Sequence, residues 1–87
     1  MQTWNVEASY RVRAPQFVKA KTVSALRTKL QRLADTYRPN EDNPPLGKLS
    51  FRYELDEQSD EAVVVHAYYQ NKYGKRARFM RLRRLVV

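Results

Sequence analysis

AVVVHAYYQNKYGKRARFMRLRR, residues 62–84, joins two strand-forming runs through a short polar turn. The first run, residues 62–70, is rich in β-branched and aromatic side chains, a composition typical of a central strand. The turn NKYG contains Gly74, which can adopt a positive φ without a steric penalty. The stretch therefore predicts a β-hairpin, around which the remaining elements can be arranged.

The second arm of this hairpin alternates only in part. KRARF, residues 75–79, places arginines opposite Ala77 and Phe79, but beyond Phe79 the apolar Met80 and Leu82 fall on the arginine side. A β-bulge near Phe79 and Met80 would return the apolar side chains to one face. A helix is the alternative, since Phe79, Leu82 and Val86 also lie near one another at helical spacing. We favour the strand.

Two other stretches alternate between apolar and polar residues with the period of a half-buried strand. They are WNVEASYRVRA, residues 4–14, and LSFRYEL, residues 49–55. Pro15 cannot donate a backbone hydrogen bond, so the first ladder should stop or bend there. The acidic segment DEQSDE, residues 56–61, is typical of a solvated turn before the hairpin.

Between these strands the apolar period changes to three or four residues, which predicts an amphipathic helix with one face on the sheet. The apolar positions are Val23, Leu26, Leu30, Leu33 and Tyr37. The start of the helix is open: Thr22 can act as N-cap, Pro15 can occupy the first turn, or a short second strand at residues 17–21 can precede it. Pro39 ends the helix near Tyr37, and a loop follows at residues 38–47.

The expected fold is a single α+β domain over residues 1–87, in the order strand, helix, strand, strand, strand, with the helix on one face of a mostly antiparallel sheet. The absence of cysteine excludes disulfides and thiolate metal sites. No segment approaches the roughly 18 apolar residues needed to cross a bilayer, and the N-terminus has no secretion-signal pattern. We expect a protein of the cytoplasm or the nucleoid, without a membrane partner.

Charge is the strongest functional signal. The formal net charge is +8, and residues 1–40, 41–62 and 63–87 contribute +6, −5 and +7. A separated positive field of this kind favours polyanionic partners. If the basic strands are neighbours, their polar faces form one arginine-lined surface, and arginine can bind phosphate in bidentate fashion and stack on bases.

The sequence therefore predicts a nucleic-acid-binding module, for DNA or RNA, in which arginines and lysines contact phosphates and tyrosines stack or donate hydrogen bonds. The candidate residues are Arg11, Arg13, Arg52, Tyr69, Lys72, Tyr73, Lys75, Arg76, Arg78, Arg81, Arg83 and Arg84. The alternative is a protein-interaction module, an inhibitor or adaptor that docks on an acidic protein surface or within a nucleoprotein complex. The apolar end LVV could then be buried in a partner or in a homodimer formed through the C-terminal strand.

An enzyme is not expected. His66 is the only histidine, and its position inside the strand AVVVHAYY favours a packed, hydrogen-bonded residue over a general base. No spacing suggests a nucleophile with its base and orienting group. The two glycines lie in separate turns, so no phosphate-binding loop is present, and the acidic residues at 56–61 fit a solvated turn better than a cation site. No cofactor or metal is predicted.

Overall fold

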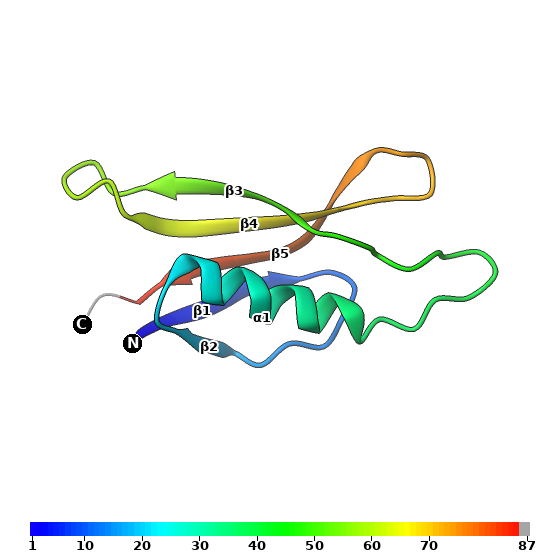
Figure 1. The fold of residues 1–87 in the computed structure, drawn as a ribbon, viewed down its shortest axis with the longest axis horizontal. Helices are drawn as coiled ribbons and strands as arrows, with labels where there is room; N and C mark the ends of the chain where they lie inside the picture. Colours follow the sequence, from blue (N-terminus) through cyan, green and yellow to red (C-terminus); the bar gives the residue numbers. More distant parts are fainter. Residues whose placement is uncertain (86–87) are drawn as a thin grey trace.

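One antiparallel sheet of five strands, in the order β2-β1-β5-β4-β3, and one helix make up this protein in a computed structural model that describes residues 1–85 (Figure 1). The elements are β1 Gln2–Ser9, β2 Phe17–Ala20, α1 Val23–Asp35, β3 Ser50–Leu55, β4 Ala62–Gln70 and β5 Arg76–Arg84. The predicted α+β class is confirmed. The sheet has one strand more than the favoured order, because the short strand considered for residues 17–21 forms as β2.

The hairpin of β4 and β5 forms with the expected bulge. Ala67 pairs with Met80 and Tyr68 pairs with Arg78, so Phe79 is the extra residue of β5. As a result Phe79 and Met80 are both buried, as is Leu82. Arg76–Arg84 is thus a strand, and the helical alternative is wrong for this segment; Val86, which that alternative included, lies outside the described residues.

The first strand is shorter than predicted. β1 ends at Ser9, and residues 10–14 lie outside it, although the alternating pattern continues through them. The reason is tertiary: β2 pairs antiparallel with β1, with Asn5 opposite Phe17, so the chain must reverse direction in between. The Ser9 hydroxyl donates to the carbonyl of Val12 at 2.6 Å and stabilises the start of this reversal.

The helix begins after Thr22, as in the first of the three starts considered for it. Thr22 is the N-cap, and its side-chain oxygen accepts a hydrogen bond from the backbone nitrogen of Ala25 at 3.0 Å. The helix ends at Asp35, two residues before Tyr37. Its buried residues are Leu26 and Leu30, two of the predicted apolar positions, and Ala34, which was not among them.

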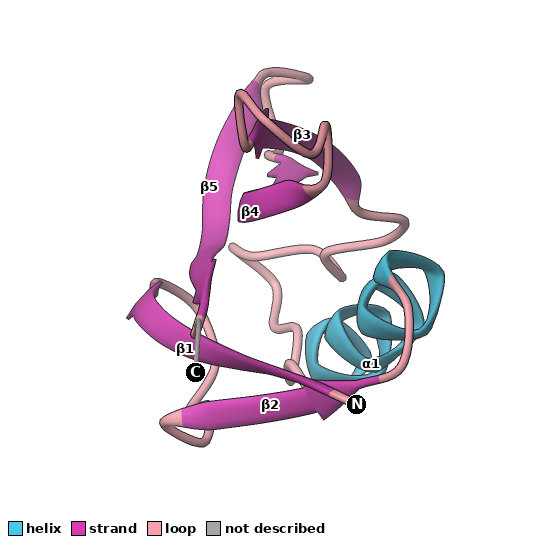
Figure 2. Ribbon diagram, turned by 90° about the vertical axis from the view of Figure 1, so that its left-hand side faces the viewer, coloured by secondary structure: helices cyan, strands magenta, loops and turns pink. Residues whose placement is uncertain are grey.

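The core lies between α1 and the concave face of the sheet, which curves so that β1 and β2 lie on one side of the helix and β3 and β4 on the other (Figure 2). Trp4, Val65, Phe79 and Leu82 contribute fully buried side chains from three strands. Within residues 1–85 no helix has the length and apolar character needed to cross a bilayer. Polar side chains predominate on the convex face, beside the buried Val64, and five of the twelve predicted site residues lie there.

Candidate nucleic-acid interface

The three adjacent strands β3, β4 and β5 bring arginines to one side of the sheet. Residues that pair directly across an antiparallel ladder point to the same face. His66 of β4 pairs with Arg52 of β3 on one side and with Arg81 of β5 on the other, which gives a row of three basic side chains. The next residue on this face of β4, Tyr68, pairs with Arg78. We call this surface the arginine face; its arginines are Arg52, Arg76, Arg78, Arg81 and Arg83.

A recess of about 130 Å³ lies in the middle of the arginine face. Arg52, Arg78 and Arg81 line it together with His66 and Tyr68, and Tyr10 closes it from the segment after β1. Three guanidinium groups around a cavity large enough for a phosphate form an anion-binding arrangement, because each group presents several N–H donors in a plane.

Two carboxylates neutralise part of this charge. Glu7, at the bulge of β1, forms an ion pair with Nε of Arg81 at 3.2 Å and accepts a hydrogen bond from Nε of Arg83 at 3.1 Å. Within residues 1–85 neither Arg52 nor Arg78 has a carboxylate within ion-pairing distance. The arginine face therefore keeps an excess of positive charge around its recess.

The second carboxylate, Glu54, holds the histidine. Nε2 of His66 donates to Oε2 of Glu54 at 2.6 Å. This hydrogen bond lowers the pKa of the Glu54 carboxyl, and the nearby charges of Arg52 and Arg83 act in the same direction. Glu54 is therefore ionised at neutral pH. His66 is the hydrogen-bonded strand residue expected from its sequence context, but the structure also places it at the centre of the arginine face.

Tyr68, not Tyr69, is the tyrosine of the arginine face. The Arg76 guanidinium lies 4.5 Å from the Tyr68 ring centroid, and the His66 ring stacks near Tyr68 with centroids 6.4 Å apart. Tyr69 points to the opposite side, where it is only 6% exposed. The prediction that Tyr69 stacks on bases with the arginines is thus wrong for this face, because adjacent strand residues alternate and the pattern did not show which of the two tyrosines faces the core.

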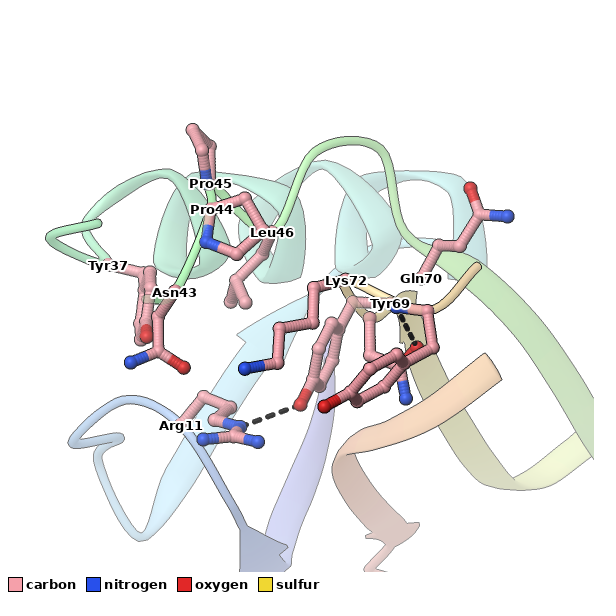
Figure 3. A pocket seen from close by; sticks show the side chains of 11 residues that line it. Arg11, Tyr37, Asn43, Pro44, Pro45, Leu46, Tyr69, Gln70 and Lys72 are labelled. Carbon is pink, nitrogen blue, oxygen red and sulfur yellow. Dashed lines mark hydrogen bonds between the residues drawn. The ribbon is translucent and has the colours of Figure 1, made fainter. Parts of the chain in front are cut away.

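The other predicted residues lie elsewhere, so the predicted site divides. Arg11 follows the end of β1 and, with Tyr69, Lys72 and Tyr73, lines a second cavity on the other side of the sheet (Figure 3). Arg84 pairs with Trp4 on the core side of β5, and its side chain, 15% exposed, donates to Glu61 at 2.9 Å. These placements correct the expectation that Arg11 and Arg84 extend the arginine face.

Arg13 and Lys75 complete the predicted set. Both are exposed, and both lie in connecting segments, Arg13 before β2 and Lys75 in the β4–β5 turn. The expectation that Arg13 projects from the first strand is wrong, since β1 ends at Ser9. Neither residue lines the recess of the arginine face.

Five residues that line the recess were not predicted as site residues: Tyr10, His66, Ala67, Tyr68 and Met80. The signal for two of them was present, because His66 and Tyr68 share the alternation of Val64 and Gln70 and hence one face of β4. The signal was ambiguous, because Val64 and Val65 are both buried, so either of the two alternating sets of side chains in β4 could be the one that faces the core. No sequence signal placed Tyr10 here, because its position follows from the end of β1.

The C-terminal strand occupies the centre of the sheet. β5 pairs with β1 along one edge and with β4 along the other, so it offers no free edge to a second copy of the chain. Leu82 is buried within the domain and Leu85 is 42% exposed. The last two residues of the LVV end, at positions 86 and 87, lie outside the described residues.

The acidic turn has its own internal bonding. The Ser59 hydroxyl donates to Asp56 at 2.9 Å, and Glu61 accepts from Arg84. Among residues 1–85 no group of three metal-ligating side chains occurs.

Comparison of this chain with protein-family models, with curated proteins and with solved structures found no match.

Proposed function

We propose that this protein is a non-enzymatic nucleic-acid-binding module that contacts phosphates with its arginine face. The observation that carries the proposal is the recess in which Arg52, Arg78 and Arg81 meet, with two of these guanidinium groups unpaired among the described residues. The positive charges of these guanidinium groups repel one another on the folded surface, and a bound phosphate would relieve this repulsion because it carries the opposite charge.

The arrangement favours backbone contacts over base recognition. Arg52, Arg78 and Arg81 come from two different strands and line one recess. Such a cluster of guanidinium groups suits binding of a phosphate better than hydrogen bonding to the edge of a base. The ring of Tyr68 is already flanked by Arg76 and His66. An unpaired base can extend this stack on the free side of the Arg76 guanidinium, so a preference for single strands is a secondary feature. Such a module acts in the cytoplasm or on the nucleoid.

Fluorescence anisotropy with labelled single-stranded DNA, duplex DNA and RNA, each at two salt concentrations, tests the proposal. The double variant Arg52→Gln/Arg78→Gln removes two phosphate contacts, so for a single strand we expect a slope of log K against log salt that is shallower by about 1.4, and at 0.1 M salt an affinity about 25-fold weaker. The control Lys21→Gln/Arg32→Gln removes the same charge from exposed positions on or beside α1 and should have a much smaller effect.

An equal loss in both double variants would show that only net charge matters. Wild-type affinity in Arg52→Gln/Arg78→Gln would remove the arginine face from the proposal.

A protein partner is the second candidate, supported by the edges of the sheet. β2 and β3 are the outer strands, and Phe17 of β2 and Leu55 of β3 are 46% and 54% exposed. An edge strand with exposed apolar side chains can add to the sheet of a partner, while the arginine face meets an acidic surface. If no oligonucleotide binds at low salt, this candidate replaces the first, and copurification of the tagged chain with acidic proteins becomes the test.

A further inference from the structure

A second cavity of about 130 Å³ lies away from the arginine face, where four segments distant in the sequence meet (Figure 3). These segments are the connection after β1, the residues just after the helix, the loop before β3, and the end of β4 with the β4–β5 turn. They contribute Arg11, Tyr37, Asn43, Pro44, Pro45, Leu46, Tyr69, Gln70, Asn71, Lys72 and Tyr73. We call this cavity the loop pocket.

Two cations point into the loop pocket, and none of its eleven lining residues is acidic. Figure 3 shows the Arg11 guanidinium and the Lys72 ammonium directed toward the same space. Each is held by a tyrosine: Nε of Arg11 donates to the Tyr69 hydroxyl at 2.6 Å, and Nζ of Lys72 lies 5.4 Å from the Tyr73 ring centroid. The hydrogen bond to the nearly buried Tyr69 restrains Arg11, which therefore loses less conformational entropy when an anion binds than a free side chain would.

The donors suit a group with several oxygen atoms. Because Nε of Arg11 is used by Tyr69, the two terminal amino groups of the guanidinium remain to donate. The Tyr69 hydroxyl accepts from Arg11, so its own proton is available to a further acceptor. With the Lys72 ammonium, the loop pocket presents donors from three side chains around one space, which matches the three terminal oxygens of a phosphate.

Charge and volume narrow the ligand class. Two cations balance a phosphate monoester, which carries about −1.5 to −2 at pH 7, better than they balance a singly charged diester or carboxylate. The cavity, of about 130 Å³, is far larger than the roughly 10–15 Å³ that one water needs by this measure, so it admits a group of several non-hydrogen atoms. The rings of Tyr37 and Pro44 and the side chain of Leu46 offer an apolar wall for the first part of an organic group.

We propose that the loop pocket binds a phosphate monoester, with Arg11, Lys72 and the Tyr69 hydroxyl on the phosphate oxygens. This site goes beyond the proposed contact of the arginine face with nucleic-acid backbones, and the two are independent because Tyr68 and Tyr69 face opposite sides of β4. The ligand is either a free phosphorylated small molecule or the terminal phosphate of a nucleic-acid strand, since both present the same group.

Isothermal titration calorimetry with AMP, adenosine and inorganic phosphate tests the proposal on the full chain. AMP should bind with one site, inorganic phosphate more weakly and adenosine not at all. Arg11→Gln and Lys72→Gln should each weaken AMP binding about 10- to 100-fold, as expected for loss of a hydrogen bond to a charged group. Arg78→Gln, on the arginine face, is the matched control and should leave AMP binding unchanged while it weakens oligonucleotide binding.

Backbone amide NMR shifts locate the site and protect the test from a folding defect. AMP should shift amides of residues 69–74 and of the loop at 43–46, and not those of residues 50–54. Arg11→Lys keeps the charge but removes the planar donor pair, so it should retain the fold and bind AMP with intermediate affinity. Absence of AMP binding at millimolar concentration, equal binding of adenosine, or loss of AMP binding in Arg78→Gln would each overturn the proposal.

A pair of oligonucleotides identifies the source of the phosphate. If a 5′-phosphorylated single strand binds more tightly than the 5′-hydroxyl strand, and Lys72→Gln removes the difference, the site holds a strand terminus. If the two strands bind equally while AMP binds to the loop pocket, the ligand is a free small molecule.

Discussion

Removal of Glu7 should strengthen nucleic-acid binding, although most substitutions in an interface weaken it. The Glu7 carboxylate forms ion pairs with both Arg81 and Arg83, at 3.2 and 3.1 Å, and so competes with phosphates for two of the five guanidinium groups on the arginine face. Glu7→Gln keeps the size of the side chain and removes its charge. The cost to folding should be small, because partly exposed ion pairs contribute roughly 0–1 kcal/mol each.

The magnitude follows from counterion release. In the wild-type chain Arg52, Arg76 and Arg78 are not paired with a carboxylate among the described residues, which gives about three phosphate contacts and a slope near −2 for a single strand. Release of Arg81 and Arg83 raises the number to about five and the slope to about −3.5. At 0.1 M salt the affinity should therefore rise by up to about 25-fold.

Anisotropy titrations of Glu7→Gln across a salt series measure both quantities. Glu57→Gln, in the exposed acidic turn, is the control for net charge, since it removes one carboxylate that contacts none of these arginines. An affinity and slope equal to those of the wild type, or an equal gain in Glu57→Gln, would refute the reasoning that Glu7 masks part of the arginine face.

Substitutions at four further positions test the fold. Phe79→Ala empties the fully buried bulge position of β5 and should cost about 3–5 kcal/mol in urea unfolding, whereas a loss below about 1 kcal/mol would show that this ring is not part of the core. Thr22→Ala should cost about 1 kcal/mol and Thr22→Ser much less, because serine keeps the N-cap oxygen; equal losses would argue against the cap. Gly74→Ala should cost about 1–2 kcal/mol, since Gly74 has φ +74° and its Cβ site is uncrowded, so that the cost comes from backbone conformation alone. The lowered pKa of the Glu54 carboxyl stabilises the folded state above about pH 4.5, and this stabilisation is lost as the pH falls through the lowered pKa. Glu54→Gln should therefore make the thermal midpoint depend less on pH in the acid range. An unchanged dependence would mean that the hydrogen bond to His66 does not stabilise the folded state.

The sequence alone determined the local elements. The period of apolar residues predicted α1 and β3, and β-branched and aromatic composition predicted β4. For β5 the partial alternation favoured a strand, and its break at Met80 and Leu82 predicted the bulge, because side chains that face the core must be apolar. The turn at Gly74 was also predictable and Thr22 was one of the starts considered for the helix, since a positive-φ turn and an N-cap depend on chemistry within a few residues.

The tertiary structure decided what depends on neighbours. β1 stops at Ser9 because β2 returns to pair with it, and this pairing is a contact between distant segments that alternation cannot indicate. The period of a strand shows which residues share a face, but not which face meets the core, so Tyr69 was assigned to the surface that Tyr68 occupies. The strand order, with β5 between β1 and β4, joined the basic residues of β3 and β5 through His66 and moved Arg11, Tyr69 and Lys72 to a separate pocket. Local patterns encode each strand, whereas the sites arise from non-local packing, and that is why the arginine face was predictable only in part.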